Sequence, residues 1–283
     1  MKIALAGYNG FLGKMIMNDL SGHDYILLNR ELLYGKPVAL ESAMEGAHIV
    51  INMSGSPISQ RWTAANRKKI LKSRHGVNTN LVTAINGLEK KPGYFITVSA
   101  IGIYDSVGIQ DENSNRRGTG FMSSVVQKWE EPVGLLDDRV KHVILRIGMV
   151  LGRDGGVINP FRKVMRFGIA PVMGSGKQMV SFIHMRDLTA SVGFIIENGL
   201  EGVFNLTSPH PVDHRGFVNA LARVTGARLK IRIPAWVLKL VMGEAHTLLT
   251  EGPHVIPSRL TEEGFGFMYP GIDQAIHNLV QEI

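Results

Sequence analysis

The chain begins with Lys2-Ile3-Ala4-Leu5-Ala6, followed at once by Gly7-Tyr8-Asn9-Gly10-Phe11-Leu12-Gly13. The first stretch is typical of a short buried strand, and residues 14–20 can form the helix that follows it. Glycines at fixed offsets in such a turn let backbone N–H groups approach a pyrophosphate at the positive end of the helix. The turn therefore predicts a dinucleotide site. Its predicted cofactor-binding residues are Gly7, Asn9, Gly10, Phe11, Leu12 and Gly13.

The glycine spacing is G-x-x-G-x-x-G, whereas the commoner fingerprint places its first two glycines one residue apart. This variant indicates a relative of the short-chain dehydrogenase/reductases. Residues 25–28 predict the second strand, which ends in Asn29-Arg30, where the ribose-reading residue belongs. A carboxylate there would accept from the ribose of NAD, while an arginine pairs with the 2′-phosphate of NADP. We predict NADP held by Asn29 and Arg30, and Glu31 leaves NAD open.

The composition limits the classes of partner. The 283 residues carry 31 Lys and Arg against 24 Asp and Glu, so 31 − 24 gives a net charge of +7, which suits anionic ligands. The basic residues are dispersed, and the cluster at 67–69 is typical of a solvated helix face, so we expect no nucleic-acid partner. There is no cysteine for a disulfide, a thiol nucleophile or a cysteine-based metal site, and the histidines are scattered, so no metal site is predicted.

The remaining pattern alternates strand-like and helix-like segments. Strands are predicted at 47–53, 94–98 and 142–146, and helices at 64–72 and 77–88. This alternation predicts an α/β fold, a doubly wound parallel Rossmann sheet. We expect a Rossmann domain over 1–152 and mainly a smaller carboxyl-terminal substrate lobe over 153–283, with residues 181–207 returning to the first domain.

Two further segments, and the lack of a third kind of segment, lead to predictions. The stretch 105–120 is rich in Gly, Asn and Ser and predicts a surface loop beside the site. Pro234 can open a helix whose apolar residues pack against the protein; they include Trp236, Leu238, Leu240, Val241, His246, Leu248 and Leu249. We see no secretory signal and no segment able to span a membrane, and so expect a cytoplasmic protein without a membrane partner.

Short motifs occur in a shared order along nearly the whole chain. They include the glycine turn, Asn52-Met53-Ser54-Gly55, Arg61-Trp62-Thr63, Ser73-Arg74, Ser99-Ala100-Ile101-Gly102-Ile103-Tyr104, Trp129-Glu130, Arg146-Ile147-Gly148-Met149-Val150-Leu151-Gly152, Gly176-Lys177-Gln178, Ser181-Phe182-Ile183-His184 with Asp187, Asn205-Leu206-Thr207-Ser208-Pro209 and Gly243-Glu244-Ala245. In this order they resemble the atypical extended short-chain dehydrogenase/reductases of the sugar-nucleotide-epimerase-like group, within the NAD-dependent epimerase/dehydratase family.

The resemblance implies a Rossmann domain, a small substrate lobe and NAD(P) binding. It places Met53, Ser54 and Gly55 under the adenosine half of the cofactor, and Val98 near the nicotinamide ribose. It brings the turn at Gly148, Met149 and Val150 to the nicotinamide. Arg74 is a further predicted cofactor contact. Arg74, Arg146 and Lys177 are also candidate anion contacts for a phosphorylated substrate, with surface or core salt bridges as the alternative. The predicted substrate-binding residues are Lys177, Gln178, Ser181 and His184.

Members of the wider superfamily use a Tyr and a Lys four residues later as the proton-transfer pair, because that spacing puts both side chains on one helix face. No tyrosine here has a lysine four residues later. The helix expected to carry the pair offers Phe121, Met122, Val125 and Val126. Lys128 lies a turn further along and is expected to face solvent.

Ser99 and Tyr104 remain as the catalytic candidates. Ser99 stands at a strand end where the superfamily often places a hydroxyl beside the reacting carbonyl, and Tyr104 follows in the next loop. An unactivated tyrosine is a poor base at neutral pH, so Tyr104 can equally form an aromatic wall of the pocket. We expect His184 and Asp187 to have a structural role or to contact substrate.

Two functional hypotheses follow. The first is an NADP(H)-binding oxidoreductase or epimerase-like protein acting on a nucleotide-sugar-like or other anionic carbonyl or hydroxyl substrate. The second is a catalytically silent NADP(H) sensor that reports to a partner through its carboxyl-terminal lobe. The absent Tyr/Lys pair favours the second, and a homodimer is left open in both.

Overall fold

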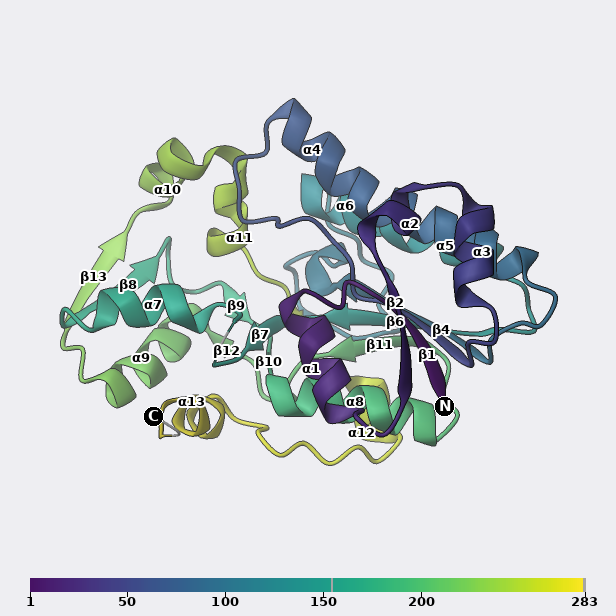
Figure 1. The fold of residues 1–283 in the computed structure, drawn as a ribbon. Coiled ribbons are helices and arrows are strands. Elements are labelled where there is room, and N and C mark those ends of the chain that lie inside the picture. Colours follow the sequence, from purple (N-terminus) through teal and green to yellow (C-terminus); the bar gives the residue numbers. More distant parts are fainter. Residues whose placement is uncertain (154, 282–283) are drawn as a thin grey trace.

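A six-stranded parallel sheet forms the larger lobe of the molecule (Figure 1). The computed structural model describes residues 1–153 and 155–281. The strands lie in the order β11-β6-β4-β3-β1-β2, all parallel, with the reversal of strand order between β1 and β3. This is a doubly wound parallel sheet, which confirms the predicted fold class. Their bounds are β1 (Lys2–Ala6), β2 (Asp24–Leu28), β3 (Ile49–Asn52), β4 (Tyr94–Ala100), β6 (Lys141–Ile147) and β11 (Gly202–Leu206).

Alternate residues of each strand face opposite helix layers. Ile3 and Leu5 of β1 lie in a core with α1 (Phe11–Asp19) and α8 (Met185–Glu197). Ala4 and Ala6 lie in the core of the opposite face, whose helices are α2 (Arg30–Tyr34), α3 (Pro37–Met44) and α5 (Val77–Gly87). Because strand side chains alternate with a period of two, both faces of these continuously apolar strands are buried.

A single helical segment follows β3 and its loop. It comprises α4 (Ala64–Leu71), a π-helical turn η1 (Lys72–Gly76) and α5, where the sequence predicted two separate helices. The π turn is located directly at Ser73 and Arg74, and π turns in helices are frequent at functional sites. The predicted helix after the loop is α6 (Phe121–Glu130), which continues into η3 (Glu131–Leu135).

The segment 105–120 pairs with a part of the chain that is distant in sequence. It contains β5 (Ile109–Gln110), which pairs with β14 (His254–Val255), and it follows the short helix η2 (Ile101–Ile103). The prediction of a plain surface loop was therefore incomplete, because its partner strand lies far away in sequence.

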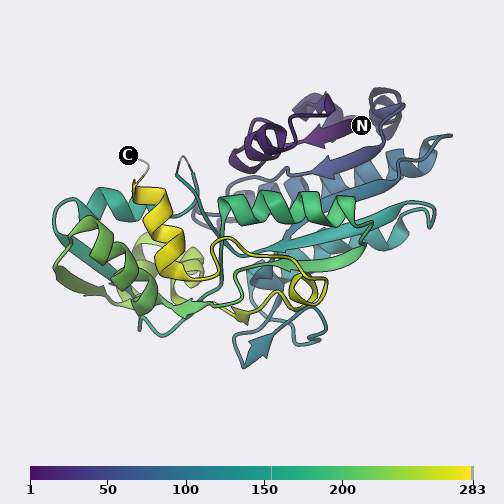
Figure 2. The same ribbon diagram turned by 90° about the horizontal axis from the view of Figure 1, so that it is seen from below.

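The smaller lobe is built mostly from the second half of the chain (Figure 2). Its two-stranded sheets pair β8 (Ile169–Met173) with β13 (Leu229–Ile233) and β9 (Met179–Val180) with β12 (Val212–Asp213); β7 (Met149–Leu151) pairs with β10 (Phe182–His184). Its core includes residues of α7 (Ile158–Met165), α9 (His214–Thr225) and α13 (Ile272–Gln281). The remaining helices are α10 (Ala235–Met242), η4 (Gly243–His246), α11 (Thr247–Thr250) and α12 (Ser258–Glu262).

The helix after Pro234 differs from its prediction. It ends at Met242, because Gly243 has a φ of +61° that terminates it. Leu238 is buried, but Trp236 and Leu240 are 70% and 72% exposed. These two side chains lie one turn apart on the side opposite Leu238. The expected packing therefore holds for one face of α10 only. No helix of the described residues has the length and apolar character needed to cross a membrane.

Candidate functional site

The glycine turn after β1 packs closely against the chain that leaves β3. Gly7 has a φ of +83°, and a Cβ built on it would lie 2.6 Å from the backbone carbonyl carbon of Met53. A Cβ on Gly13 would lie 2.3 Å from the carbonyl oxygen of Gly7. Gly10 is the N-cap of α1, and no side chain caps this helix. The N–H groups of its first turn are therefore open to an anion, as a pyrophosphate requires.

Asn52 orders the end of β3. Its Oδ1 accepts hydrogen bonds from the Ser54 N–H at 3.0 Å and the Ser54 hydroxyl at 2.6 Å. Its amide nitrogen donates to Asn78 Oδ1 of α5 at 2.7 Å. Met53 and Ser54 are half-buried and Gly55 is exposed, so this predicted adenosine segment lies beside Gly7 at the carboxyl edge of the sheet.

Arg74 is a buried cation beneath the same segment. Its Nη1 donates to the carbonyl oxygen of Ser56 at 3.0 Å, and a Cβ on Gly55 would lie 3.1 Å from its Nη2. The guanidinium stacks 4.8 Å from the ring centroid of Trp129. Its Nε is buried without a hydrogen-bond partner, and within the described residues no carboxylate pairs with it. Burial lowers the pKa of Arg74 to about 10. The residue thus resembles half of an ion pair, with the anion to come from a ligand.

A basic pocket of about 660 Å³ lies beyond the end of β2. Arg30 and Lys72 flank the Tyr34 ring, with their charged groups 5.4 and 5.6 Å from its centroid. Asn29 caps α2 by accepting a hydrogen bond from the Leu32 N–H at 2.9 Å. The lining residues are Arg30, Glu31, Tyr34, Ala65, Lys68, Lys69 and Lys72, which bring four cations to one carboxylate. An excess of three positive charges favours a phosphate there.

The sequence missed the lysines of the basic pocket. Residues 67–69 indicated a solvated helix face, and Lys68, Lys69 and Lys72 are indeed exposed. Only the folded structure reveals that this face also lines a pocket with Arg30. A spacing of three and four residues along one basic helix was the available signal.

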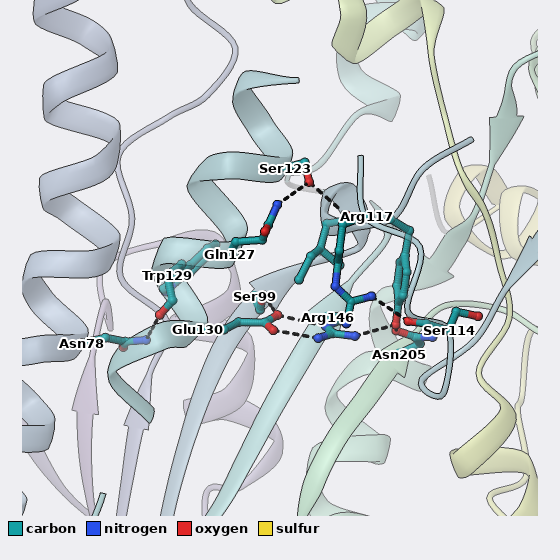
Figure 3. Close-up of polar contacts among 12 residues, drawn as sticks. Asn78, Ser99, Ser114, Arg117, Ser123, Gln127, Trp129, Glu130, Arg146 and Asn205 are labelled. Atoms are coloured by element: carbon teal, nitrogen blue, oxygen red, sulfur yellow. Dashed lines mark hydrogen bonds and ion pairs between the residues drawn. The ribbon is translucent and has the colours of Figure 1, made fainter. Parts of the chain in front are cut away.

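A second group of polar side chains lies at the ends of β4 and β6, and we call it the closed network (Figure 3). Arg146 donates to both carboxylate oxygens of Glu130, at 2.9 and 2.7 Å, and Ser99 donates its hydroxyl to the same carboxylate. Arg146 also donates to the Tyr104 hydroxyl at 2.8 Å, which in turn donates to Asn205 Oδ1 at 2.9 Å. Every member of this chain of contacts is paired, and Arg146, a candidate anion contact in the sequence, forms the alternative core salt bridge with Glu130.

The closed network is almost completely shielded from solvent. Ser99, Tyr104 and Arg146 are at most 4% exposed. Burial raises the pKa of the Tyr104 hydroxyl, although the charge and hydrogen bond of Arg146 oppose this. Burial by itself would lower the pKa of Arg146, but the hydrogen bonds and charge of Glu130 outweigh it and raise that pKa. The Tyr104 hydroxyl has a raised pKa, accepts from Arg146 and donates to Asn205, so it is held in the neutral form.

Helix α6 presents the apolar face that its sequence predicted. Phe121 packs on Trp62 with ring centroids 4.9 Å apart, and Val125 and Val126 are buried. Lys128 is exposed, in agreement with the expectation that it faces solvent. Directly after β6, Gly148, Met149 and Val150 are half-buried, and Val98 of the neighbouring strand β4 is buried within the sheet.

Three of the four predicted substrate-binding residues bond to the protein itself. The Gln178 amide donates to the carbonyl oxygen of Leu249 at 2.7 Å, and the Ser181 hydroxyl donates to that of Pro253 at 2.9 Å. His184 is the N-cap of α8 and stacks on Tyr269, with centroids 3.9 Å apart. Lys177 alone of the four is exposed.

Asp187 has a clear structural partner. Its two carboxylate oxygens accept the N–H groups of Met268 and Tyr269, at 2.8 and 3.0 Å. These bonds anchor the segment that leads into α13, which agrees with the expected structural role. Among the described residues, no cluster of three or more His, Asp or Glu side chains could hold a metal ion.

Comparison with known proteins places the chain among epimerase-like proteins. A family model described as a domain of unknown function, DUF1731, matches residues 233–279. Over 303 residues the chain is 30% identical to the "Epimerase family protein SDR39U1 homolog, chloroplastic" of Arabidopsis thaliana, covering 99% of this chain and 87% of that protein. Over 292 residues it is 30% identical to the "Epimerase family protein SDR39U1" of Mus musculus, covering 99% and 100%.

A solved structure gives the same result. The human epimerase family protein SDR39U1 (isoform 2), crystallised with NADPH, superposes with a TM-score of 0.91 at 27% identity and full coverage of both chains. Fold and relatives therefore define an epimerase-like protein of the extended short-chain dehydrogenase/reductase class. Within that class, the chain belongs to the SDR39U1 epimerase family. The resemblance predicted from the sequence is confirmed.

Proposed function

We propose that this protein binds NADP(H) across the carboxyl edge of its sheet. The observation that carries the proposal is the basic pocket, where four cations meet one carboxylate next to the ribose-reading position. The NADPH in the related human structure supports it. The first turn of α1 would hold the pyrophosphate, while Met53, Ser54 and Gly55 would lie under the adenosine. Gly148, Met149, Val150 and Val98 would approach the nicotinamide half.

Arg74 completes the proposed cofactor site. Its buried, partly unpartnered guanidinium lies under Gly55 and would neutralise an anionic oxygen of the cofactor or of a bound substrate. Arg30 would pair with the 2′-phosphate in a charge-assisted contact, which is stronger than a neutral hydrogen bond. Asn29 would position Arg30 indirectly, because its side chain caps the helix that carries it.

The cofactor preference tests this assignment. Fluorescence titrations should show tighter binding of NADPH than of NADH, and Arg30→Ala should weaken NADPH binding by about tenfold to a hundredfold while leaving NADH unchanged. Lys90→Ala, a substitution of an exposed lysine away from the pocket, is the matched control. Equal affinities for the two cofactors in the wild-type protein would contradict the role of Arg30.

The proposed activity is that of an oxidoreductase or an epimerase-like protein acting on a nucleotide-sugar-like or other anionic carbonyl or hydroxyl substrate. When bound, the nicotinamide supplies or accepts the hydride. The net charge of +7 and the exposed Lys177 would favour an anionic substrate. A reductase needs one proton donor, whereas an epimerase also needs a base, so the reductase demands less of the groups present.

In this proposal Ser99 and Tyr104 act as positioning residues. Both hydroxyls are donated inside the closed network, and the α6 face above them is apolar. They would hold the ends of β4 and β6 at a fixed distance, so that the edge receives substrate and cofactor in one geometry. Either hydroxyl could donate to substrate only after breaking its present hydrogen bond.

The closed network also favours the second candidate, a catalytically silent NADP(H) sensor. A proton-transfer group that is neutral, dry and fully paired supports binding better than turnover. A screen of carbonyl substrates against the NADPH-bound protein separates the two functions. Oxidation of NADPH above the no-substrate rate supports the enzyme, and saturated cofactor without turnover on any nucleotide sugar supports the sensor.

A further inference from the structure

The smaller lobe carries a row of exposed apolar side chains, which we call the apolar strip. The described residues include fourteen exposed large hydrophobic side chains, and six of them belong to this row. Its members are Phe167, Leu229, Ile231, Trp236, Leu240 and Val241. Their exposed fractions run from 41% at Ile231 to 72% at Leu240. Isolated exposed apolar residues are ordinary, whereas a concentration on one face marks an interaction site.

Backbone contacts make the strip continuous. The carbonyl oxygen of Gly168, next to Phe167, accepts the N–H groups of Arg228 and Leu229, at 3.1 and 2.9 Å. Strand β13 then runs through Ile231 to Pro234, where α10 begins. Figure 1 shows β13 and α10 along the outer edge of the smaller lobe, away from the six-stranded sheet. On α10, Trp236, Lys239 and Leu240 share the exposed face.

The charge around the strip is mostly positive, and the nearby carboxylate of Glu244, which follows α10, pairs with Arg67. Residues 155–178 and 214–243, which supply α7, β8, α9, β13 and α10, contain no Asp or Glu. The exposed basic residues beside the strip are Lys163, Arg166, Arg228, Lys230, Arg232 and Lys239. None of these six forms an ion pair with a carboxylate in the part of the chain that the structure describes. Along β13 the apolar Leu229 and Ile231 alternate with the basic Lys230 and Arg232, and all four are exposed. Apolar and basic side chains therefore adjoin along this edge of the lobe.

We propose that this face docks the protein on an anionic lipid surface. Exposed Trp and Leu beside Lys and Arg are the composition that inserts at the headgroup level of a bilayer. A second copy of the chain fits poorly, because a two-fold contact would bring six cations against six. The sequence argued against a membrane from the lack of a spanning segment, and a peripheral contact needs no such segment.

Vesicle flotation tests the proposal. The wild-type protein should float with vesicles of phosphatidylcholine and phosphatidylglycerol, bind phosphatidylcholine alone at least about tenfold more weakly, and be released by high salt. Tryptophan fluorescence gives a second readout, because Trp62 and Trp129 are 8% and 5% exposed while Trp236 is 70% exposed. A blue shift on vesicle binding, lost in Trp236→Phe, would locate the contact at α10.

Four variants separate the strip from general charge and hydrophobicity. Trp236→Ser with Leu240→Ser, and Lys230→Glu with Lys239→Glu, should each lower partitioning by about tenfold or more. The matched controls are Leu135→Ser, whose side chain is 73% exposed outside the strip, and Lys90→Glu; both should partition like the wild type. All four should keep the wild-type thermal midpoint and NADPH affinity, since these side chains are exposed and outside the cofactor site.

Three results would overturn the proposal. The first is wild-type protein that does not float with anionic vesicles, or that binds neutral vesicles equally well. The second is a dimer in sedimentation velocity that Trp236→Ser dissociates, without any vesicle binding, which would make a second copy the occupant. The third is binding of soluble polyglutamate through Lys230 and Lys239 without vesicle binding, which would indicate an acidic polypeptide.

Discussion

Two groups of charged side chains lie at the carboxyl edge of one sheet, and they differ in how their charges are balanced. Arg74 and the basic pocket lie beyond β2 and β3, where cations outnumber carboxylates and a buried guanidinium nitrogen has no partner. The closed network lies beyond β4 and β6, where Arg146 has its carboxylate and each hydroxyl has an acceptor. Both groups contain side chains of the types that bind ligands or transfer protons.

The difference shows which group awaits a ligand. Leaving a buried charge unpaired is costly, so an unbalanced cation at a sheet edge indicates an anion that the protein does not itself supply. In a balanced network, the pairing of its own charges already offsets the cost of burying them. The proposed cofactor side therefore has charge left for an anionic ligand, whereas the groups on the side where proton transfer is expected already pair with one another.

Breaking the closed network should have the largest effect. Arg146→Met leaves the largely buried Glu130 carboxylate without a cation and with only the Ser99 hydroxyl as a partner, and we expect a loss of about 3–5 kcal/mol in the free energy of unfolding. Denaturant unfolding monitored by circular dichroism measures it. The double substitution Arg146→Met with Glu130→Leu should recover part of the loss, because neither charge then remains. A double variant that is no more stable than the single one would contradict the view of a mutually balanced pair.

The glycine turn should tolerate less change than other glycines. Gly7→Ala puts a methyl group 2.6 Å from the Met53 backbone at a φ of +83°. We expect about 2 kcal/mol of destabilisation and weaker NADPH binding, since β1 and β3 must separate. Gly22→Ala, where a Cβ meets nothing within 4 Å, is the control and should unfold like the wild type. Equal stability and equal NADPH affinity of the two variants would contradict the tight packing inferred at Gly7.

Arg74 tests the open side directly. Arg74→Met keeps the stacking volume over Trp129 but removes the charge, so affinity for both NADPH and NADH should fall by about tenfold. Titration calorimetry measures both cofactors, and Lys90→Met serves as the exposed-lysine control. Cofactor affinities that do not change would mean that the Arg74 guanidinium has a structural role only.

The smallest effect should come from Tyr104→Phe. The variant leaves Arg146 Nη1 and Asn205 Oδ1 without the hydroxyl, at a cost of about 1–2 kcal/mol in stability. Any NADPH-linked turnover should remain within a few-fold of wild type if Tyr104 is a positioning residue. A loss of turnover with unchanged stability and unchanged NADPH affinity would instead make its hydroxyl a catalytic group and erase the distinction between the two sides.

Much of the proposed cofactor side follows from the order of residues along the chain. The glycine turn, Met53–Gly55, Asn29 and Arg30 each follow a strand directly, and consecutive parallel strands bring their carboxyl ends to one edge. Lys68, Lys69 and Lys72 could not be assigned in this way, because only the fold brings their helical segment to the same pocket as Arg30. The exposed face of α10 was likewise hidden, since an apolar helix pattern does not reveal whether a partner element covers each side.

The sequence alone determined the Rossmann sheet, the dinucleotide turn and the missing Tyr/Lys pair, because all three depend on residues close together in the chain. Only the tertiary structure decided which charges remain without a partner. Glu130 and Arg146 are 16 residues apart in sequence, Tyr104 and Asn205 are 101, and their pairing depends on strand order. The strength of such pairs depends on how deeply they are buried, and burial exists only in the folded molecule.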